Sequence, residues 1–457
     1  MPVLTAAEIA RICAGRVTGD EWARVSAIAG DSRAIGERAG FVAIRGGHEF
    51  VGDAFAHGAV LAIVERSEVI PDGATGVVVG DSVAALATLA AEVRTRLGLR
   101  VVGITGSTGK TMTKDFTAAA LSARYRVHAS PRSFNTEVGV PLVVLSCPDD
   151  AQVLVVEMGA RHHGEIAELA TIVRPDIGVV TGIGTTHIGE FGSRMVIART
   201  KAELLASLPA GGLAVVPADD DFLPLLVAST SARVATVGPG GSVRFQSDDV
   251  ELVRAGGELR GRTKGTISDV PITLPVAGRA LMRNAAVAAC VAAELGVPME
   301  ESVRAIGDAR PTSRRMEIVS LGGWVVVNDA YNANPTSVSS ALRTVRELAG
   351  SAQAWAVLGE MAELGDRSEL EHARIGRLAA ALGYSGLVVV GEAAAPLARA
   401  VGTAATRVDT ISEAADTVVE RVPPGAHLLV KGSLVTGLKD FGEVLAERLG
   451  QIPSRTG

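Results

Sequence analysis

The sequence predicts an α/β protein with three domains, in which the second and third are built on parallel sheets. A chain of 457 residues is too long to fold around a single hydrophobic core. At roughly 150 residues per domain, this length suggests three domains. Along most of the chain, short apolar runs alternate with stretches of helical periodicity. The runs are apolar throughout, which is typical of strands buried on both faces of a parallel sheet.

The first predicted domain spans residues 1–98 and has α/β character. It contains three strand-like runs, GFVAIRG, AVLAIVE and TGVVVG. The segment SVAALATLAAEVRTRLG, which closes this domain, has good helix formers with apolar side chains at helical spacing. The N-terminal stretch MPVLTAAEIARICAG predicts an amphipathic helix, because it lacks the basic segment and apolar core of a secretion signal.

The second predicted domain spans residues 99–308 and the third spans residues 309–457. In the second, the runs LRVVGITG, VLVVEMG, IGVVTGIG and LAVVPA indicate a parallel sheet covered on both faces. The glycine-rich turn after the first run, TGSTGKT, predicts that this domain is of the phosphate-loop ATPase kind. In the third, WVVVNDAY, AWAVLGEM, GLVVVGE and HLLVKGS run into polar turns and alternate with helices. This second alternating pattern predicts a Rossmann-like domain.

The composition argues against several classes of function. The formal net charge is −6, and no basic block interleaves with aromatic residues, so we do not expect a nucleic-acid partner. No run reaches the roughly 18 apolar residues of a membrane span, so we expect a cytoplasmic protein without membrane insertion. Cys13, Cys147 and Cys290 are far apart in the sequence, which predicts buried thiols and not a disulfide framework or a zinc site.

The stretch GITGSTGKTMTKD at residues 103–115 predicts a phosphate-binding loop of unusual length. The widespread G-x-x-x-x-G-K-[ST] pattern would need glycine where Ile104 stands. The loop nevertheless lies between a predicted strand and a predicted helix, so its N–H groups and the helix N-terminus would point at an anion. The alternative is a glycine-rich turn without function. The residues predicted to bind ATP here are Thr105, Gly106, Ser107, Thr108, Gly109, Lys110 and Thr111.

Two side chains near this loop are candidates for Mg²⁺ ligands. The hydroxyl of Thr111 follows the lysine, as in other phosphate loops. Glu157 ends the run VLVVE, and a carboxylate at the carboxyl end of a neighbouring parallel strand would lie beside the loop. A solvated acid at a strand end is the alternative for Glu157.

The shortened loop with a second threonine, GKTMT, resembles the ATP loop of the Mur ligase family and of its relatives, the folylpolyglutamate synthetases. The segment around HIGEFGS also matches this family's N-x-x-x-x-H-x-x-x-F-G-S pattern. The resemblance implies that His187 binds a second Mg²⁺. It further implies that Lys201, at the match of an A-K-A-E type sequence, is carbamylated by CO₂. Taken singly, a hydrogen-bonded histidine and a solvated lysine are the alternatives.

Carbamylation makes a physical demand on Lys201. The reaction needs the neutral amine, which is scarce at the ordinary lysine pKa of about 10.4. A buried site rich in cations disfavours the ammonium form. We therefore expect Lys201 to be buried close to the metal.

The same resemblance implies two places where a uridine diphosphate substrate is held. The segment SFNTEVGVP matches the family's N-x-x-x-G-V-P, which makes Asn135 and Thr136 candidates beside the substrate diphosphate. From the residues alone, this stretch predicts a polar loop that enters a strand. In the first domain, DSRAI makes Ser32 and Arg33 candidates near the uridine diphosphate, so the resemblance implies a UDP-binding domain.

Four further residues are implied to act on the nucleotide. Asn284 matches the family's base-contacting Asn-Ala, although Ala280 and Leu281 replace its usual histidine and asparagine. A helix cap is the alternative for Asn284. Arg315, in SRRMEIV, would bring a guanidinium to the γ-phosphate. Asp329 and Asn332 would touch the nucleotide from the third domain, with turn chemistry as the alternative.

Two further stretches, YNANP and AVLGEMAELGDRSELEH, resemble the D-alanyl-D-alanine-adding subfamily. The stretch LVKGSLVTGL also fits, with Leu434 where the family often has arginine. The resemblance covers essentially the whole chain. It implies an ATP-dependent ligase that joins D-alanyl-D-alanine to a UDP-N-acetylmuramoyl tripeptide in cell-wall synthesis and uses two Mg²⁺ and a lysine carbamate. We expect the protein to be a monomer. The implied catalytic residues are Lys110, His187, Lys201 and Arg315.

Two other functions are weighed against this one. A folylpolyglutamate-type ligase would share the loop and the modified lysine, but it would lack the DSR segment and the YNANP turn. A nucleotide-switch protein would use the loop to order a partner-binding surface. The chain has no N-K-x-D guanine motif, so the switch is the weaker of the two.

Overall fold

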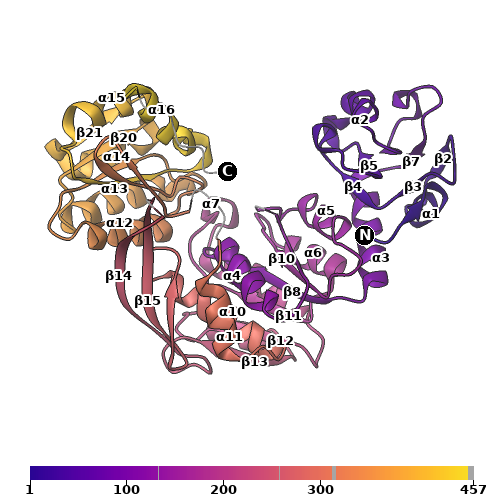
Figure 1. Ribbon diagram of the computed structural model, residues 1–457, viewed down its shortest axis with the longest axis horizontal. Coiled ribbons are helices and arrows are strands. Elements are labelled where there is room, and N and C mark those ends of the chain that lie inside the picture. Colours follow the sequence, from indigo (N-terminus) through magenta and orange to yellow (C-terminus); the bar gives the residue numbers. More distant parts are fainter. Residues whose placement is uncertain (132, 257, 311–314, 451–457) are drawn as a thin grey trace.

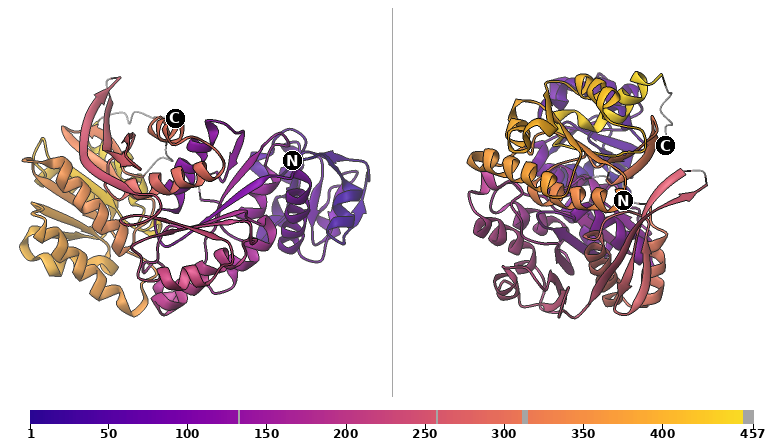
Figure 2. Two further views of the ribbon diagram at one scale, coloured as in Figure 1. Left: turned by 90° about the horizontal axis from the view of Figure 1, so that it is seen from below. Right: turned by 90° about the vertical axis from the view of Figure 1, so that its left-hand side faces the viewer.

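The computed structural model describes residues 1–131, 133–256, 258–310 and 315–450. The chain forms three lobes in sequence order, and the central lobe joins the N-terminal and C-terminal lobes (Figure 1). The left-hand view in Figure 2 shows the same order, with the N-terminal lobe at one end of the long axis. The predicted α/β class is confirmed. Among the described residues, no helix has the length and apolar character needed to cross a membrane.

The N-terminal lobe contains a five-stranded sheet in the order β2-β7-β6-β5-β4. Its strands are parallel except for β2, which pairs antiparallel with β7. A separate antiparallel pair joins β1 to β3. The elements are β1 Leu4–Thr5, α1 Ala6–Ile12, β2 Arg16–Thr18, β3 Arg24–Val25, β4 Ala27–Ala29, β5 Ala39–Val42, α2 Val51–Ala56, β6 Ala62–Val64, β7 Gly76–Val78 and α3 Ser82–Leu97.

Helix α3 connects this lobe to the central one. Asp81 caps its first turn by accepting hydrogen bonds from two backbone N–H groups, and Gly98 ends it in the left-handed conformation with φ of 62°. The helix packs against α5 (Gly139–Leu145) and α6 (Glu165–Val173) of the central lobe.

The central lobe is built on a six-stranded parallel sheet in the order β13-β12-β11-β8-β10-β9. Helices α4, α10 and α11 cover one face, while α5, α6 and α8 cover the other. The elements not yet named are β8 Arg100–Thr105, α4 Lys110–Ser122, β9 Val127–Ala129, β10 Val153–Glu157, β11 Ile177–Val180, α7 Ile188–Phe191, α8 Arg194–Ala206, β12 Leu213–Pro217, α9 Leu223–Ala228, β13 Arg233–Val237, α10 Leu281–Glu294 and α11 Met299–Gly307.

Strand β8 lies where the order of the sheet reverses. The chain passes from β8 to the edge strand β9, returns to β10 on one side of β8, and then crosses to β11 on the other side. The carboxyl ends of β8, β10 and β11 are therefore neighbours. Such a switch point is where open parallel sheets bind their ligands.

Two parts of the central lobe differ from the sequence prediction. The apolar run after residue 138 was expected to be a strand, but it is helix α5. Periodicity cannot separate a short helix from a buried strand in so short a run. The sequence also did not predict the antiparallel sheet of β14 Phe245–Ala255, β15 Glu258–Ile267 and β16 Val270–Leu274. The long β14 and β15 extend toward the C-terminal lobe (Figure 1).

The C-terminal lobe has a six-stranded sheet in the order β17-β18-β22-β19-β20-β21, parallel except for the edge strand β17. Helices α12 to α14 cover one face, and α15 and α16 cover the other. The elements are β17 Glu317–Leu321, β18 Trp324–Asn328, α12 Pro335–Ala349, β19 Ala354–Leu358, α13 Ser368–Ala381, β20 Gly386–Val390, α14 Ala395–Val401, β21 Ala405–Val408, α15 Ile411–Arg421, β22 His427–Lys431 and α16 Phe441–Arg448.

Candidate functional site

The predicted phosphate loop lies between the end of β8 and the start of α4, as expected. Gly106 and Gly109 have φ of 140° and 82°, conformations that side chains rarely adopt. A Cβ atom at Gly106 would lie 2.1 Å from the hydroxyl of Thr181, and one at Gly109 would lie 2.8 Å from the amide nitrogen of Asn284. Both positions therefore need glycine, and the loop can approach a bound anion closely.

Residues that follow β11 hold the loop in place. The Thr181 hydroxyl donates to the Thr108 carbonyl at 2.5 Å, and the Thr186 hydroxyl donates to the Ser107 carbonyl at 3.0 Å. The Ser107 hydroxyl accepts a hydrogen bond of 2.8 Å from the Gly184 N–H. These three bonds use backbone carbonyls and one side-chain oxygen of the loop, and the Ser107 N–H also donates to the Gly182 carbonyl at 2.9 Å.

Thr105 and Lys110 lie at the two ends of the loop. The Thr105 hydroxyl donates to the Met158 carbonyl at 2.9 Å, which ties the end of β8 to the chain after β10. The ammonium of Lys110 donates to the Gly106 carbonyl at 2.8 Å, so it folds back over the loop. Burial lowers the pKa of Lys110, and the charges of Glu157 and Arg315 act on it in opposite directions.

Thr111 and Glu157 meet at the carboxyl ends of β8 and β10. The Thr111 hydroxyl donates to Oε2 of Glu157 at 2.7 Å, and the Asn135 amide donates to Oε1 of the same carboxylate at 2.7 Å. Glu157 is only 2% exposed, so the alternative of a solvated acid is wrong. Hydroxyl, amide and carboxylate oxygens in one place make a donor set that suits Mg²⁺.

Lys201 lies in α8 and is 3% exposed, which excludes the alternative of a solvated lysine. Burial, reinforced by the positive charge of Lys110, lowers its pKa to about 7. The ammonium group lies 5.5 Å from the centre of the Phe191 ring. Among the described residues it has no recorded hydrogen-bond acceptor, so a buried amine faces this site without a fixed partner.

His187 directly precedes α7, in the left-handed conformation with φ of 58°. Its Nδ1 atom contacts a carboxylate oxygen of Glu363, which comes from the C-terminal lobe. Burial lowers the pKa of His187; the Glu363 charge opposes this effect, and Lys110 and Lys201 reinforce it. The structure thus brings His187 close to both lysines.

Asn284 and Arg315 reach the loop from outside the central sheet. Asn284 is the fourth residue of α10, and its amide donates to the Gly109 carbonyl at 3.2 Å, so the alternative of a helix cap is wrong. Arg315 donates to the Thr111 hydroxyl at 3.0 Å and lies 4.4 Å above the Tyr331 ring. The neighbouring Arg314 lies outside the described residues.

Asp329 and Asn332 surround a buried lysine of the C-terminal lobe. The Lys431 ammonium donates to Oδ2 of Asp329 at 2.5 Å and to the Asn332 carbonyl at 2.9 Å. The Asn332 side chain accepts from the Ala333 N–H at 2.8 Å, which is turn chemistry. Within the described chain, neither residue has a recorded contact with the phosphate loop.

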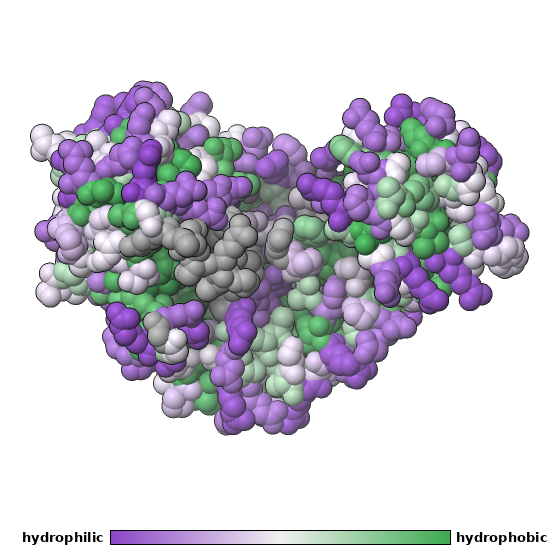
Figure 3. All heavy atoms as spheres, turned by 45° about the horizontal axis from the view of Figure 1, so that its top comes forward, coloured by the Kyte–Doolittle hydropathy of each residue, from purple (hydrophilic) through white to green (hydrophobic). Residues whose placement is uncertain are grey.

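The remaining predicted residues lie farther toward the N-terminal lobe. Ser32 is 7% exposed and begins a short 3-10 helix, whereas the Arg33 guanidinium is exposed and pairs with Asp31 at 2.8 Å. The Thr136 hydroxyl accepts a hydrogen bond of 3.3 Å from the Gly139 N–H at the start of α5. The space-filling view shows a hollow between the N-terminal and C-terminal lobes (Figure 3).

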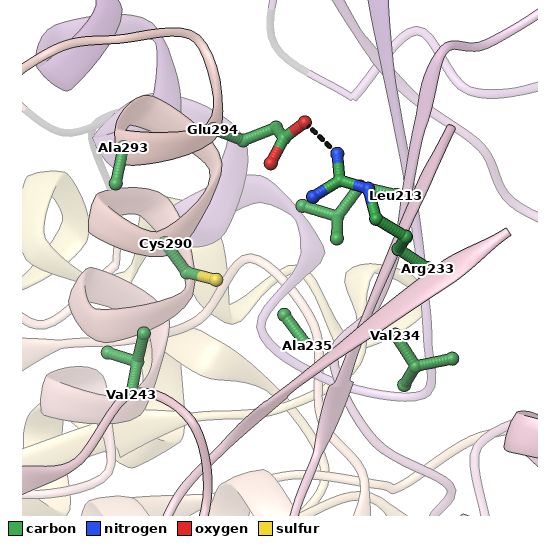
Figure 4. Close-up of a pocket in the computed structure, with 8 residues that line it drawn as sticks. All are labelled: Leu213, Arg233, Val234, Ala235, Val243, Cys290, Ala293 and Glu294. Carbon is green, nitrogen blue, oxygen red and sulfur yellow. Dashed lines mark hydrogen bonds and ion pairs between the residues drawn. The ribbon is translucent and has the colours of Figure 1, made fainter. Parts of the chain in front are cut away.

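A pocket of about 570 Å³ lies elsewhere, between β13 and the last turns of α10 (Figure 4). It is lined mainly by apolar side chains and bordered by the ion pair of Arg233 and Glu294. Burial raises the pKa of Cys290, which faces this pocket, to about 12, so the thiol stays protonated. No predicted site residue lines this pocket. In the described ranges, no cluster of three or more His, Cys, Asp and Glu could hold a metal.

The fold and this site together define a phosphate-loop α/β protein whose C-terminal lobe reaches the loop. The family model of the Mur ligase middle domain matches residues 104–292 of this chain, and the model of the Mur ligase glutamate ligase domain matches residues 314–434. The UDP-N-acetylmuramoyl-tripeptide–D-alanyl-D-alanine ligase of Mycobacterium bovis is 41% identical over 85% of this chain and 83% of its own length. The chain belongs to the Mur ligase family.

Solved structures agree with this assignment. MurF from Acinetobacter baumannii superposes with a TM-score of 0.85 at 30% identity, over 98% of this chain and 99% of its own. MurF from Thermotoga maritima, solved in complex with ADP, has a TM-score of 0.79 at 27% identity, over 93% and 98% of the two chains. A folylpolyglutamate synthase of Mycobacterium tuberculosis, at 17% identity and a TM-score of 0.60 over 81% and 95%, shares only the fold.

Sequence reasoning did not single out several residues that build this site. Thr181 and Thr186 hold the loop through ordinary hydrogen bonds, and isolated threonines give no signal for that role. Lys431 and Glu363 lie in the stretches LVKGS and AELGD, which resemble the Mur ligase family but give no signal for the contacts of these two residues. Their partners are about 100 and 176 residues away, so only the folded chain could reveal them.

Proposed function

We propose that this chain is the ATP-dependent ligase that adds D-alanyl-D-alanine to a UDP-N-acetylmuramoyl tripeptide during cell-wall precursor synthesis. The observation that carries the proposal is the pairing of Thr111 with Glu157 beside Lys110, in a chain that is 41% identical to a relative named for this activity. ATP would phosphorylate the terminal carboxylate of the tripeptide. The amine of D-alanyl-D-alanine would then attack the acyl phosphate, and inorganic phosphate would leave.

The residues of the loop and its neighbours would bind and orient ATP. Lys110 and the N–H groups of residue 106 and residues 108–111 would hold the β- and γ-phosphates, where they neutralise negative charge. Arg315 reaches Thr111 and can turn its guanidinium to the phosphoryl group that moves. Asn284, which lies against Gly109, would contact the nucleotide on its base side, with Asp329 and Asn332 approaching from the C-terminal lobe.

Magnesium fits the residues that are present. The Thr111 hydroxyl and the two oxygens of Glu157 converge in a buried place, which is the oxygen-rich donor set that this cation prefers. Bound there, Mg²⁺ would neutralise the phosphates and polarise the transferring group. A second ion would be held by His187 and Lys201, provided that the amine carries a carboxylate-like group.

Lys201 meets the requirements for carbamylation. It is buried, and its pKa is lowered to about 7, so about half of its amine is neutral at that pH and can attack CO₂. The product is an anion in a place where Lys110 supplies positive charge. The carbamate would thereby replace the repulsion between two ammonium groups with an attraction between an anion and the ammonium of Lys110.

Catalysis would then rest on orientation and electrostatics, without a protein nucleophile. Asn135 and Thr136 would border the substrate diphosphate, and Ser32 and Arg33 would hold the uridine end. The guanidinium of Arg33 is exposed in the N-terminal lobe and can exchange Asp31 for a phosphate. Movement of the lobes toward one another would bring the substrates together and exclude water.

The proposal extends to the roles of the three domains, the cellular location and the oligomeric state. The regions 1–98, 99–308 and 309–457 would act as the UDP-binding, ATP-binding and C-terminal ligase domains. Because ATP and nucleotide-activated precursors are cytoplasmic, the enzyme would work in the cytoplasm. The protein would act as a monomer, which light scattering at assay concentration can check.

The test is an omission series that follows phosphate release from ATP. The proposal expects release only when UDP-N-acetylmuramoyl tripeptide and D-alanyl-D-alanine are both present. A folylpolyglutamate-type ligase would respond to a folate and glutamate instead. Phosphate release that needed neither peptide substrate would defeat the proposal.

A further inference from the structure

Glu363 bridges the C-terminal and central lobes at the candidate site. One carboxylate oxygen contacts Nδ1 of His187, and the other lies 3.2 Å from the Arg161 guanidinium. The carbonyl oxygen of Glu363 accepts a hydrogen bond of 3.0 Å from the N–H of Gly189. Two contacts therefore join Glu363 to the segment that carries His187, and a third joins it to Arg161, which follows β10 of the same central lobe. In Figure 1, α7, which follows His187, lies beside the C-terminal lobe.

The backbone at this junction is shaped for close approach. A Cβ atom at Gly189 would lie 2.8 Å from the N atom of Gly365, and one at Gly365 would lie 3.0 Å from Cα of Gly189. Both His187 and Glu363 hold positive φ, at 58° and 63°. Non-glycine residues in this conformation carry strain that the surrounding structure must offset, and such strain concentrates at functional sites.

The chemistry of the pair defines its role. A histidine that ligates a metal through one ring nitrogen usually donates its other N–H to a carboxylate, which fixes the tautomer and the orientation of the ring. Here the carboxylate contacts Nδ1, so the lone pair of Nε2 is left for a cation. Unlike a carboxylate on the same lobe, Glu363 reaches the ring only when the two lobes are together.

We propose that Glu363 is a positioning residue that presents His187 to the second cation when the C-terminal lobe meets the central lobe. This inference rests on the proposed function, because it takes His187 as a ligand of that cation. Closure of the lobes would thus complete the second cation site. Phosphoryl transfer would be confined to the closed enzyme, in which water is excluded.

A merely structural ion pair is the competing interpretation, and cation affinity separates the two. Manganese serves as the probe, bound to the full-length enzyme with a non-hydrolysable ATP analogue and the UDP-tripeptide, and free Mn²⁺ is followed by electron paramagnetic resonance. Glu363→Ala removes the carboxylate, whereas Glu363→Gln keeps an oxygen that can accept from Nδ1–H. Glu369→Gln is the matched control, since Glu369 lies in the same lobe and pairs with Arg399 at the surface.

We expect the wild-type enzyme and Glu369→Gln to bind two Mn²⁺ ions. Glu363→Ala should weaken one of them by about 10- to 100-fold, the usual effect of losing a carboxylate behind a ligating histidine, and Glu363→Gln should restore part of the loss. In turnover, Glu363→Ala should lower kcat while KM for the UDP-tripeptide changes little. Two ions bound by Glu363→Ala as tightly as by the wild type would overturn the inference.

A steric variant tests the same junction without touching the carboxylate. Gly189→Ala places a methyl group against Gly365, so it should keep the lobes apart and weaken the same Mn²⁺ ion. Gly442→Ala is its control, because a Cβ atom at that glycine meets nothing within 4 Å. Small-angle scattering should show a larger radius for Gly189→Ala alone. An unchanged radius with unchanged Mn²⁺ affinity would contradict the inference.

Failure of the inference and failure of the proposed function have different signatures. If the wild-type enzyme binds two ions and releases phosphate only with both substrates, but Glu363→Ala binds both ions equally well, the inference alone is wrong. If the wild-type enzyme binds one ion, the proposed second cation is wrong, and the inference falls with it.

Discussion

Arg315 donates a hydrogen bond of 3.0 Å to the hydroxyl of Thr111, although 204 residues separate them in the chain. The guanidinium also stacks over Tyr331, so it is held between the C-terminal lobe and the phosphate loop. With ATP bound as proposed, this position would bring one positive charge to the phosphates together with the C-terminal lobe. The contribution of Arg315 to the reaction rate can therefore be measured separately from the contribution of the loop to ATP affinity.

We therefore expect Arg315→Ala to lower kcat by about 10³-fold, since a positioned arginine acts mainly on the charge of the transition state. The affinity for ATP should fall by less than about tenfold, because Lys110 and the loop remain. The kcat of Arg315→Lys should lie between those of the wild type and Arg315→Ala, because an ammonium group keeps the charge but lacks the planar fork of a guanidinium. Single-turnover kinetics with nucleotide titration provides the measurement. A large loss of affinity with unchanged kcat would contradict this role.

Glu157 accepts hydrogen bonds from Thr111 and Asn135, which fixes both of its oxygens. Glu157→Gln keeps the size of the side chain but removes its charge. We expect the Mg²⁺ concentration at half-maximal rate to rise by about 100-fold or more, because a direct ligand matters at least as much as its supporting groups. Glu168→Gln, at an exposed position of α6, is the control. Equal Mg²⁺ dependence of both variants would remove Glu157 from the metal site.

Lys201→Ala should nearly abolish turnover, because the anion that the proposed carbamate would supply is lost with the amine. Short carboxylic acids such as acetate should restore part of the activity by entering the vacated space. Lys439→Ala, at a half-exposed lysine of the C-terminal lobe, should be fully active without added acid. The measurement is the rate of phosphate release against acid concentration. A fully active Lys201→Ala variant would exclude the carbamate.

The lowered pKa of Lys201 predicts a pH dependence with a definite sign. In CO₂-free protein, the folded chain releases this proton near pH 7, whereas the unfolded chain holds it until about 10.5. The unfolded state binds more protons between these values, so this group makes folding more favourable as pH rises from about 7 to 10.5. Lys201→Met should stabilise the folded state most below pH 7, as measured by urea unfolding.

Carbamate occupancy should follow the same titration. At a fixed concentration of dissolved CO₂, the neutral amine becomes commoner as pH rises through about 7. We expect the carbon-13 signal of a carbamate, seen with labelled CO₂, to grow between pH 6 and 8 and to be absent from Lys201→Ala. A signal that was independent of pH in this range would place the modified amine elsewhere.

The sequence predicted the position of a candidate residue best where a chemically suitable side chain stands at the end of a predicted strand or between a strand and a helix. The placement of Gly106, Gly109 and Lys110 between a strand and a helix was predicted because a glycine turn in that position is typical of a phosphate loop. The placement of Glu157 beside this loop was predicted because the carboxyl ends of parallel strands meet at one edge. Lys201 and His187 depended on the family resemblance, since a single lysine or histidine carries almost no signal.

What the sequence did not predict depends on long-range contacts. Helix α5 was expected to be a strand because a short run of valines and leucines fits either structure. The Asn284 side chain was weighed as a helix cap, but it reaches the Gly109 carbonyl in another part of the lobe. The contact of Glu363 with His187 joins two lobes, and no local pattern encodes it.

The central claim is that this site activates a carboxylate by phosphorylation before an amide bond forms. It is tested most directly with UDP-N-acetylmuramoyl tripeptide in which both oxygens of the terminal carboxylate are oxygen-18, incubated with ATP, Mg²⁺ and D-alanyl-D-alanine. Attack of the amine on an acyl phosphate leaves one carboxylate oxygen on the departing phosphate, so mass spectrometry should find one oxygen-18 in each phosphate released. Phosphate without the label, in a reaction that still forms the amide, would contradict the account.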